Sequence, residues 1–231
     1  MSLSGSIMRI DIITLFPEVF EPYFKSSILK RAQEKGLLKI HLHNLRDYAK
    51  DRHKTVDDAP FGGGGGMVLK IEPVAAALEK IKIKNEKLKV KVIATSTRGE
   101  KFDQKKALEY SKLDQLIIIC GRYEAIDERV LDYYCDETIS VGPYILTGGE
   151  LPAMIIVDAT ARLIPKVLGN EQSLKNDFKK SPYEAISFPQ YTRPEVFLTA
   201  EGKKLKVPKV LLSGNHKQIK AWRVKKMKKI N

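Results

Sequence analysis

Short β-branched runs that alternate with helical patterns are the feature that most constrains the fold of this chain. Four runs have the length and composition of strands: RIDIITLF (9–16), KIHLHNL (39–45), KVKVIATS (89–96) and QLIIIC (115–120). Helical patterns lie between or after them: FDQKKALEYSKL (102–113), DERVLDYYC (127–135) and LPAMIIVDATARLI (151–164). This alternation predicts an α/β domain with a mostly parallel sheet, because parallel strands are joined by helical crossovers.

Three loops that follow predicted strands have a composition suited to ligand binding. They are ATSTRGE (94–100), CGRYEAIDE (120–128) and SVGPYILTGGE (140–150), and each is rich in Gly, Ser, Thr or Pro. Ligands of parallel α/β sheets bind beyond the carboxyl ends of the strands. Any one loop alone could be an ordinary turn, but the three together favour a ligand site at this edge.

Five consecutive glycines at 62–66 stand out in a chain that has fifteen glycines in all. The run matches neither the Walker A pattern nor the dinucleotide-binding fingerprint. One interpretation is a flexible linker, although linkers are polar and a strand or helix pattern, MVLKIEPVAAALEKI, follows at once. Because ordered glycine is costly in conformational entropy, the other interpretation is that a ligand approaches the main chain closely here.

Positive charge is concentrated at the C-terminus. The chain of 231 residues is 43% hydrophobic and has a net charge of +13, which suits one large domain or one domain plus a small one. Residues 201–231 carry eleven Lys or Arg and one acid, so they account for +10 of this charge. The segment NHKQIKAWRVKKMKK predicts a docked helix with Ile219, Trp222, Met227 and Ile230 on one side and a basic outer face. Such a block binds nucleic acid or an anionic membrane, or is a solvated tail; the charge rules favour nucleic acid.

Cysteine usage and hydropathy bear on the cellular setting. Cys120 and Cys135 lack metal-site or redox spacing and lie in apolar or amphipathic runs, so we expect buried, unpaired thiols. No run approaches the roughly 18 apolar residues of a membrane span, and no secretory leader pattern is present. These observations predict a cytoplasmic protein without a membrane partner.

Five segments resemble motifs of the bacterial tRNA (guanine-N(1)-)-methyltransferases, a family of the knotted SPOUT class. They are DRHKTVDDAPFGGGGGM (51–67), GRYEAIDERV (121–130), SVGPYILTGGELPAM (140–154), QYTRPEVF (190–197) and LLSGNHKQIKAWR (211–223). The resemblance covers nearly the whole chain from Met8 onward. It implies a homodimeric enzyme that uses S-adenosylmethionine to methylate ring nitrogen 1 of the guanosine at tRNA position 37, next to the anticodon.

The same resemblance implies a division of the chain. Residues 8–165 would form an α/β SPOUT methyltransferase domain with a deep trefoil knot. Residues 166–182 would be a flexible linker that carries the catalytic aspartate, and 183–231 a small, mostly helical, basic domain that binds tRNA. Periodicity alone predicts only an open, doubly wound sheet, since chains do not usually thread loops.

The three post-strand loops match the segments with which this family holds its cofactor. The residues implied are Ser96, Thr97, Gly121, Glu124, Val141, Gly142, Pro143, Tyr144, Ile145, Leu146, Gly148 and Gly149. Main-chain N–H and C=O groups, which small residues leave accessible, should make many of the contacts with the cofactor. Glu124 matches an acid near the methionyl end of the cofactor; its alternative role is a carboxylate that stabilises a helix N-terminus. The resemblance also implies a Mg²⁺ ion, for which the sequence indicates no ligands.

The proposed chemistry requires a base and a cation. Ring nitrogen 1 of guanine carries a proton, so a general base must remove it, and a fixed cation must stabilise the negative charge that spreads to O6. The resemblance assigns Asp177 as the base and Arg162 as the cation. Without the resemblance, Asp177 would be interpreted as an ordinary loop acid.

The resemblance also places the glycine run, Gly62, Gly63, Gly64, Gly65 and Gly66, beside the target base. Arg52 and His53 would contact phosphate, and Asp57 or Asp58 would accept from the N–H groups on the guanine edge. Many relatives carry proline where Gly65 stands.

Two alternatives to this function stay open at the level of sequence. One is an RNA-binding module without catalytic activity, and the other is a knotted methyltransferase that acts on another RNA. The presence of both Asp177 and Arg162 favours an enzyme.

Overall fold

The structure of this chain is a computed structural model that describes residues 7–168 and 186–229. The chain divides into two compact units, Met1–Glu171 and Gln172–Asn231. Among the described residues, no helix combines the length and the apolar composition needed to cross a membrane.

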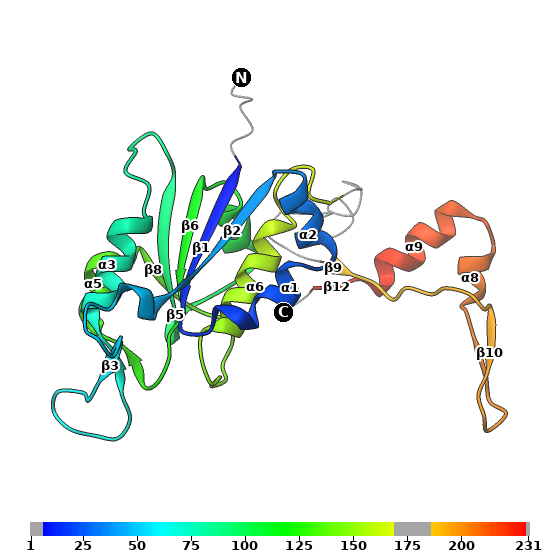
Figure 1. The fold of residues 1–231 in the computed structure, drawn as a ribbon. Helices are drawn as coiled ribbons and strands as arrows, with labels where there is room; N and C mark the ends of the chain where they lie inside the picture. The colour runs from blue at the N-terminus through cyan, green and yellow to red at the C-terminus, as the bar shows by residue number, and fades with distance from the viewer. Residues whose placement is uncertain (1–6, 169–185, 230–231) are drawn as a thin grey trace. The chain divides into compact units, whose positions relative to one another are not determined.

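A five-stranded sheet lies at the centre of the first unit (Figure 1). Its strand order is β2-β1-β6-β5-β8, and every neighbouring pair is parallel. The strands are β1 Met8–Thr14, β2 Leu38–Asn44, β5 Val90–Lys101, β6 Gln115–Ile119 and β8 Glu137–Ser140. The predicted α/β class with a parallel sheet is therefore confirmed.

The four predicted strands all form, and β8 is a fifth that the sequence did not indicate. All five residues of β6 are buried, which explains why its sequence is a continuous aliphatic run. By contrast, β8 reads ETIS and contains a single large aliphatic residue, Ile139. A strand this short and polar lacks the hydrophobic signal on which the prediction rests.

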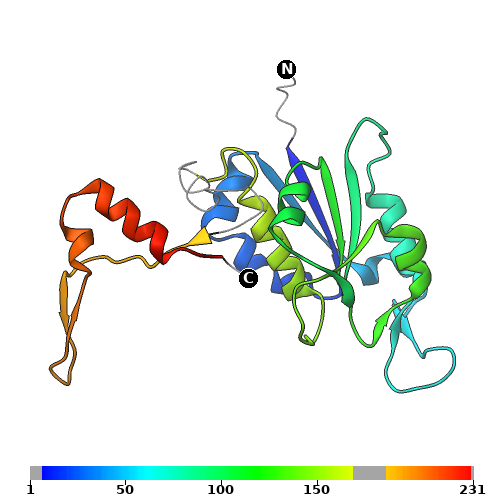
Figure 2. The same ribbon diagram turned by 180° about the vertical axis from the view of Figure 1, so that it is seen from behind.

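Helices cover both faces of the sheet (Figures 1 and 2). Because side chains alternate along a strand, Ile12 and Ile13 of β1 enter different cores. The core with Ile12 contains residues of α1, α2, α4 and α6, and the core with Ile13 contains residues of α3 and α5. The helices are α1 Glu21–Phe24, α2 Ser27–Glu34, α3 Ile71–Ile81, α4 Gln104–Tyr110, α5 Glu128–Tyr134 and α6 Glu150–Ala161, with 3₁₀ turns η1 Pro17–Val19 and η2 Leu45–Tyr48.

A small second sheet joins the glycine run to the loop after β6. It has the order β3-β4-β7, where β3 is Asp57–Asp58, β4 is Val68–Leu69 and β7 is Ala125–Ile126. Strands β3 and β4 are antiparallel, and the glycine run connects them. Strand β4 is parallel to β7, with Val68 opposite Ala125 and Leu69 opposite Ile126. The ambiguous pattern after the glycines is thus a short strand followed by α3.

Strand β5 contains a loop-out at its carboxyl end. Thr95 and Glu100 both lie opposite Ile139 of β8, so residues 96–99 leave the ladder and return to it. Gly99 lies so close to β8 that a Cβ there would come within 2.5 Å of the Ile139 nitrogen. Only glycine fits this approach, because real Cβ atoms do not come so near to backbone atoms.

The second unit mixes strands and helices, so its described part is less helical than the resemblance implied. Its elements are β9 Ile186–Ser187, β10 Val196–Leu198, β11 Lys204–Lys206, α8 Lys209–Leu212, α9 His216–Lys226 and β12 Lys228–Lys229. Strand β10 pairs with β11, and β9 pairs with β12, both antiparallel.

The predicted C-terminal helix forms but ends earlier than its sequence pattern suggested. Asn215 caps it, accepting a hydrogen bond from the Gln218 nitrogen at 3.1 Å. Ile219 and Trp222 are half-buried, as expected for its apolar side. Met227, however, has extended backbone and follows the helix end, so it is not part of that side, and Ile230 lies outside the described residues.

Candidate functional site

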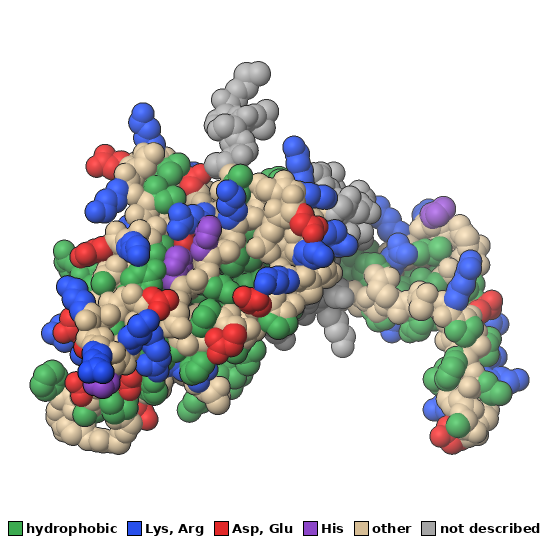
Figure 3. Space-filling model, viewed as in Figure 1, with side chains coloured by type: hydrophobic (Ala, Val, Ile, Leu, Met, Phe, Trp, Pro, Cys, Tyr) green, Lys and Arg blue, Asp and Glu red, His purple; other side chains and the backbone are tan. Residues whose placement is uncertain are grey.

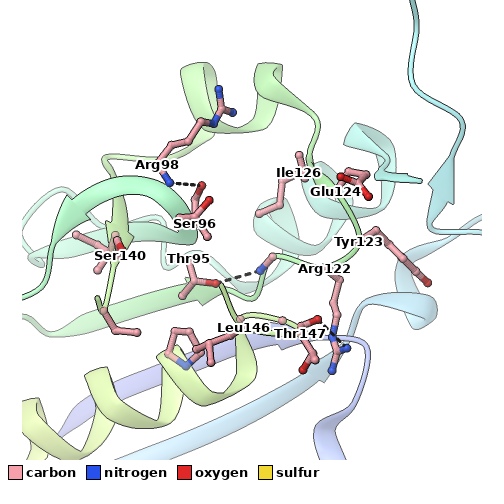
Figure 4. A pocket seen from close by; sticks show the side chains of 18 of the residues that line it. Thr95, Ser96, Arg98, Arg122, Tyr123, Glu124, Ile126, Ser140, Leu146 and Thr147 are labelled. Atoms are coloured by element: carbon pink, nitrogen blue, oxygen red, sulfur yellow. Dashed lines mark hydrogen bonds between the residues drawn. The ribbon is translucent and has the colours of Figure 1, made fainter. Parts of the chain in front are cut away.

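Three loops enclose a cavity of about 270 Å³ at the carboxyl edge of the central sheet (Figure 4). They are the loop-out of β5 and the segments after β6 and β8, on which the sequence prediction rested. Ten of the twelve residues implied as cofactor-binding line this cavity: Ser96, Thr97, Gly121, Glu124, Val141, Gly142, Tyr144, Leu146, Gly148 and Gly149. Pro143 and Ile145 do not line it, and the Ile145 side chain is 89% exposed.

The floor of the cavity is formed where the ends of the strands pack against the start of α6. The Thr95 hydroxyl accepts a hydrogen bond from the Gly121 nitrogen at 3.1 Å, and the Gly149 nitrogen donates to the Gly121 oxygen at 2.7 Å. A Cβ on Gly149 would lie 2.1 Å from Thr95 Oγ1 and 2.6 Å from the Gly121 nitrogen. These glycines therefore have a packing role that the sequence prediction, which considered only access to a ligand, did not include.

A partly buried ion pair that the sequence prediction missed holds two of the loops together. Glu150 is 5% exposed; its Oε1 accepts from the Thr14 hydroxyl at 2.8 Å and its Oε2 from Arg122 Nε at 3.1 Å. Arg122 also donates to the Thr147 oxygen at 3.1 Å, and its guanidinium lies 4.5 Å from the centre of the Phe16 ring. The two charges are paired and hydrogen-bonded, which offsets the cost of removing them from water. Arg122 lies within one predicted loop and Glu150 ends another, which is the only signal that could have linked them.

The cavity wall combines apolar and polar groups. Ile126, Leu131 and Pro152 contribute apolar surface that the sequence prediction did not name. Arg98 contributes a charged group at the rim, and its side chain donates to Glu128 at 2.6 Å. An apolar wall with a few oriented polar groups is the usual lining of a site for a flat organic ligand.

Glu124 lies where the cavity meets the glycine run. Its nitrogen donates to the Met67 oxygen at 3.0 Å, and a Cβ on Gly66 would lie 2.5 Å from the Glu124 side chain. The alternative role, stabilising a helix N-terminus, belongs to another residue. Helix α5 begins at Glu128, and its cap is Asp127, whose side chain accepts from the Arg129 nitrogen at 3.0 Å.

The glycine run connects the two paired strands β3 and β4 and so lies within one sheet, not between domains. Its backbone takes left-handed φ angles of +89° at Gly62, +80° at Gly63, +117° at Gly64 and +82° at Gly66. A Cβ at Gly62, Gly63 or Gly64 would meet no atom within 4 Å, so backbone conformation, not crowding, is what requires glycine at these three positions. The neighbouring Phe61 side chain is fully exposed.

The other residues implied to bind substrate lie on the segment that leads into this loop. Arg52 and His53 are exposed in a turn in which the Asp51 carboxylate accepts from the His53 nitrogen at 3.1 Å. Asp57 and Asp58 form β3, directly before the glycine run. Strand β3 forms one edge of the small sheet, whereas Glu124 directly precedes β7 at the other edge, beside Gly66.

Of the two residues implied as catalytic, the structure describes the position of Arg162 but not that of Asp177. Arg162 is half-exposed at the C-terminal end of α6, and it is not among the residues that line the cavity. Asp177 lies outside the described residues.

The two cysteines add no reactive group to this site. Burial raises the pKa of Cys120 well above its usual value and that of the half-buried Cys135 to about 12, so both are unpaired thiols that stay protonated. Within residues 7–168 and 186–229, no cluster of three or more His, Cys, Asp or Glu side chains could hold a metal ion.

Comparison with known proteins extends the similarity over the whole described chain. The family model of tRNA (Guanine-1)-methyltransferase TrmD matches residues 8–230. The chain is similar to proteins named tRNA (guanine-N(1)-)-methyltransferase from several bacteria. The one from Geobacter metallireducens is 50% identical over 219 residues, covering 95% of this chain and 86% of the relative. Those from Carboxydothermus hydrogenoformans and Staphylococcus aureus are 52% and 51% identical, covering 94% of this chain and 82% and 84% of the relatives.

Proposed function

This chain belongs to the tRNA (guanine-1)-methyltransferase family, and we propose that it transfers a methyl group from S-adenosylmethionine to ring nitrogen 1 of the guanosine at tRNA position 37. The observation that carries this proposal is the cavity built by the loop-out of β5 and the loops after β6 and β8, beside the end of the glycine run. Its place in tRNA maturation makes the cytoplasm the expected compartment.

The residues of the cavity fit the proposed cofactor. Ile126, Leu131 and Pro152 provide apolar surface for the adenine ring, and main-chain groups of the glycine-rich loops can read its polar edge. The Glu124 carboxylate at the rim suits the positively charged methionyl end. When bound, S-adenosylmethionine supplies an electrophilic methyl group on a sulfonium sulfur.

The chain's own residues prepare the guanine for attack on that methyl group. We assign Asp177 to removal of the proton from nitrogen 1 and Arg162 to stabilisation of the negative charge on O6. The bare main chain at 62–66 gives the purine a surface to lie against, and Asp57 or Asp58 accepts from its N–H groups. Arg52 and His53 neutralise phosphate.

The knot of this class is part of the proposal. Two close approaches support a threaded connection: residues 95–100 pass around Ile139, and Gly149 lies against Gly121 and Thr95 after the chain has left β8. We propose the knotted domain at 8–165, the linker at 166–182 and the tRNA-binding domain at 183–231. The two-unit division at Glu171 and Gln172 is the feature that motivates a boundary in this region.

Exposed apolar residues on α6 support a homodimer. Ala153, Ile156 and Val157 face the core, yet Leu151 and Ile155 on the opposite side are 56% and 44% exposed. A helix that is apolar all round is normally buried all round, so a second copy is the occupant we propose for this side. Val19 and Tyr23 add exposed apolar surface nearby, since the Tyr23 hydroxyl donates to Asp158 of α6 at 3.1 Å. Figure 3 shows hydrophobic side chains among charged ones of both signs over this part of the first unit.

Methyl transfer to paired tRNA transcripts tests the function. A transcript with guanosine at position 37 should be methylated and one with adenosine there should not, and calorimetry should detect S-adenosylmethionine binding. A binding module without catalysis would show neither methyl transfer nor cofactor binding. Methylation that ignores position 37 would indicate another RNA target.

The assignment of the base has its own test. Asp177→Asn keeps the shape of the side chain but accepts no proton, so single-turnover methyl transfer should fall by about 10² to 10⁴. The cofactor loops belong to the first unit, so S-adenosylmethionine affinity should stay near that of the unaltered protein. A normal rate, or loss of cofactor binding, would show that Asp177 is not the base.

A further inference from the structure

We propose that the second unit contains a pocket for one unstacked base of the tRNA, formed by Phe188, Tyr191, Trp222 and Arg223. The identity of the ligand rests on the proposed function, because it takes tRNA as the substrate. The pocket itself is a cavity of about 400 Å³ between residues 188–195 and helix α9.

Aromatic rings and guanidinium groups converge on this cavity. The Tyr191 and Trp222 rings lie edge to face with their centres 6.2 Å apart. The Arg223 guanidinium lies 5.3 Å from the centre of the Phe188 ring. Unpaired bases bind proteins by stacking on aromatic side chains and on the planar guanidinium of arginine.

The cavity is open to solvent and is not the closed core of a small domain. No side chain described between 188 and 227 is fully buried, and Tyr191 is 49% exposed. Val207, Leu211 and Ile219 provide an apolar floor, while Arg193 and Glu195 add polar groups able to contact base edges. A flat ring with a polar rim is the ligand shape that this lining suits.

Charge favours a nucleic-acid ligand over other flat molecules. Residues 201–231 carry eleven basic side chains and one acid, and Figure 3 shows Lys and Arg spread over the second unit. Such a surface attracts the phosphate backbone without regard to sequence. The pocket would then select single-stranded segments, because in a duplex the bases are stacked and out of reach.

Trp222 provides the measurement, since it is the only tryptophan of the chain. Intrinsic fluorescence of the full-length protein would be titrated with tRNA, a single-stranded RNA and a duplex of the same length. A base stacked against Trp222 should quench its emission with tRNA and with the single strand, and the duplex should quench several-fold less. Binding of all three without quenching, or equal quenching by duplex and single strand, would overturn the proposal.

Matched variants separate stacking from charge. Tyr191→Leu keeps apolar bulk but removes the ring, so affinity for the single strand should fall by about 5- to 100-fold, the range expected for one lost stack, whereas Tyr191→Phe should bind normally. Arg223→Gln and Lys220→Gln each remove one positive charge from α9, and Arg223→Gln should weaken binding several-fold more. Equal effects of these two, or normal binding by Tyr191→Leu, would show that the surface recognises phosphate alone.

This outcome is independent of the enzymatic assay. Quenching without methyl transfer would preserve the pocket and reject the proposed function. Methyl transfer without quenching would reject the pocket and preserve the proposed function. If Tyr191→Leu fails to fold by circular dichroism, the titrations of the unaltered protein and the Arg223–Lys220 comparison still decide the question.

Discussion

Gly64 and Gly65 stand side by side in the same open loop but differ in backbone conformation. Gly64 has a φ of +117°, which side chains rarely adopt, whereas Gly65 is outside the left-handed region, and neither would bring a Cβ within 4 Å of another atom. Crowding cannot therefore explain any difference between substitutions at the two sites.

We expect Gly64→Ala to lower kcat/KM for tRNA by about tenfold or more and Gly65→Ala to lower it much less. A left-handed conformation costs an L-residue about 1–2 kcal/mol, so the loop should shift at position 64. Steady-state methylation measures the effect, and calorimetry with S-adenosylmethionine is the control, since neither residue lines the cofactor cavity. Equal losses would indicate that bulk beside the target base, not backbone conformation, is what the loop excludes.

Residue roles could be predicted from the sequence only where a local pattern carries them. The composition of three loops was enough to indicate a ligand site at this edge of the sheet, and the resemblance supplied the twelve residues, ten of which line the cavity. The pair of Arg122 and Glu150 was missed because its partners are 28 residues apart and nothing local connects them. Asp177 has no distinguishing pattern at all, so its assignment depends on the resemblance.

At the scale of elements, hydrophobic periodicity predicted the strands and helices with many buried side chains and missed those with few. β6 was predicted because all its residues are buried, whereas β8, with one large aliphatic side chain, was not. Helix α9 was extended too far because Met227 continues the apolar spacing although the backbone there is already extended. The small sheet β3-β4-β7 could not be anticipated, since two-residue strands give no periodic signal.

The exposed side of α6 gives a prediction about assembly. Ile155→Asp places a charge in the proposed interface, so sedimentation should shift from dimer to monomer. Methyl transfer should be lost together with the dimer, because Arg162 lies on the same side of α6, seven residues further on. Tyr133→Asp is the matched control. Tyr133 is 81% exposed on α5, over the other face of the sheet, and its substitution should leave the dimer intact. A dimeric Ile155→Asp protein would place the interface elsewhere.

A cluster around Glu137 joins β8, β5 and α4. Its carboxylate accepts from Lys106 at 2.8 Å, from the Tyr110 hydroxyl at 2.8 Å and from Lys91. Burial would raise the pKa of Glu137, but hydrogen bonds from Lys106, Lys91 and Tyr110 outweigh it and hold the pKa at about 2. Lys106 also contacts Glu100 at 2.6 Å, so the cluster secures the residues that return from the β5 loop-out.

This cluster predicts how stability changes with acid. A carboxyl whose pKa falls on folding stabilises the native state above its unfolded pKa of about 4.3, and that contribution is lost as the pH falls towards about 2. Glu137→Gln should therefore lower the thermal midpoint near neutral pH and make the decline between about pH 4.3 and pH 2 shallower. Differential scanning calorimetry across this range measures both. An unchanged pH profile would show that other carboxylates dominate acid unfolding.

At the scale of the whole molecule, the distribution of charge matters more than its total. Residues 201–231 hold +10 of the net +13, so the first 200 residues are nearly balanced. Neutralising phosphates releases counterions, and each contact adds roughly 0.7 to 0.9 to the slope of log affinity against log salt concentration. If the C-terminal block contacts the RNA, the position of the lysines, not only their number, should determine the slope of log affinity against log salt concentration.

Two quadruple variants with the same net charge test this point. Replacing Lys225, Lys226, Lys228 and Lys229 by Gln lowers the formal charge from +13 to +9, and so does replacing Lys82, Lys84, Lys87 and Lys89. The first variant should bind tRNA more weakly at low salt, and its slope should be smaller by up to about 2.8 to 3.6, since it loses up to four phosphate contacts. The second should keep most of the slope, because its lysines follow α3 at the amino-terminal edge of β5, at the end of the sheet opposite the cavity. Equal reductions would mean that only total charge steers the RNA, and an unchanged slope in the first variant would show that the C-terminal block is a solvated tail.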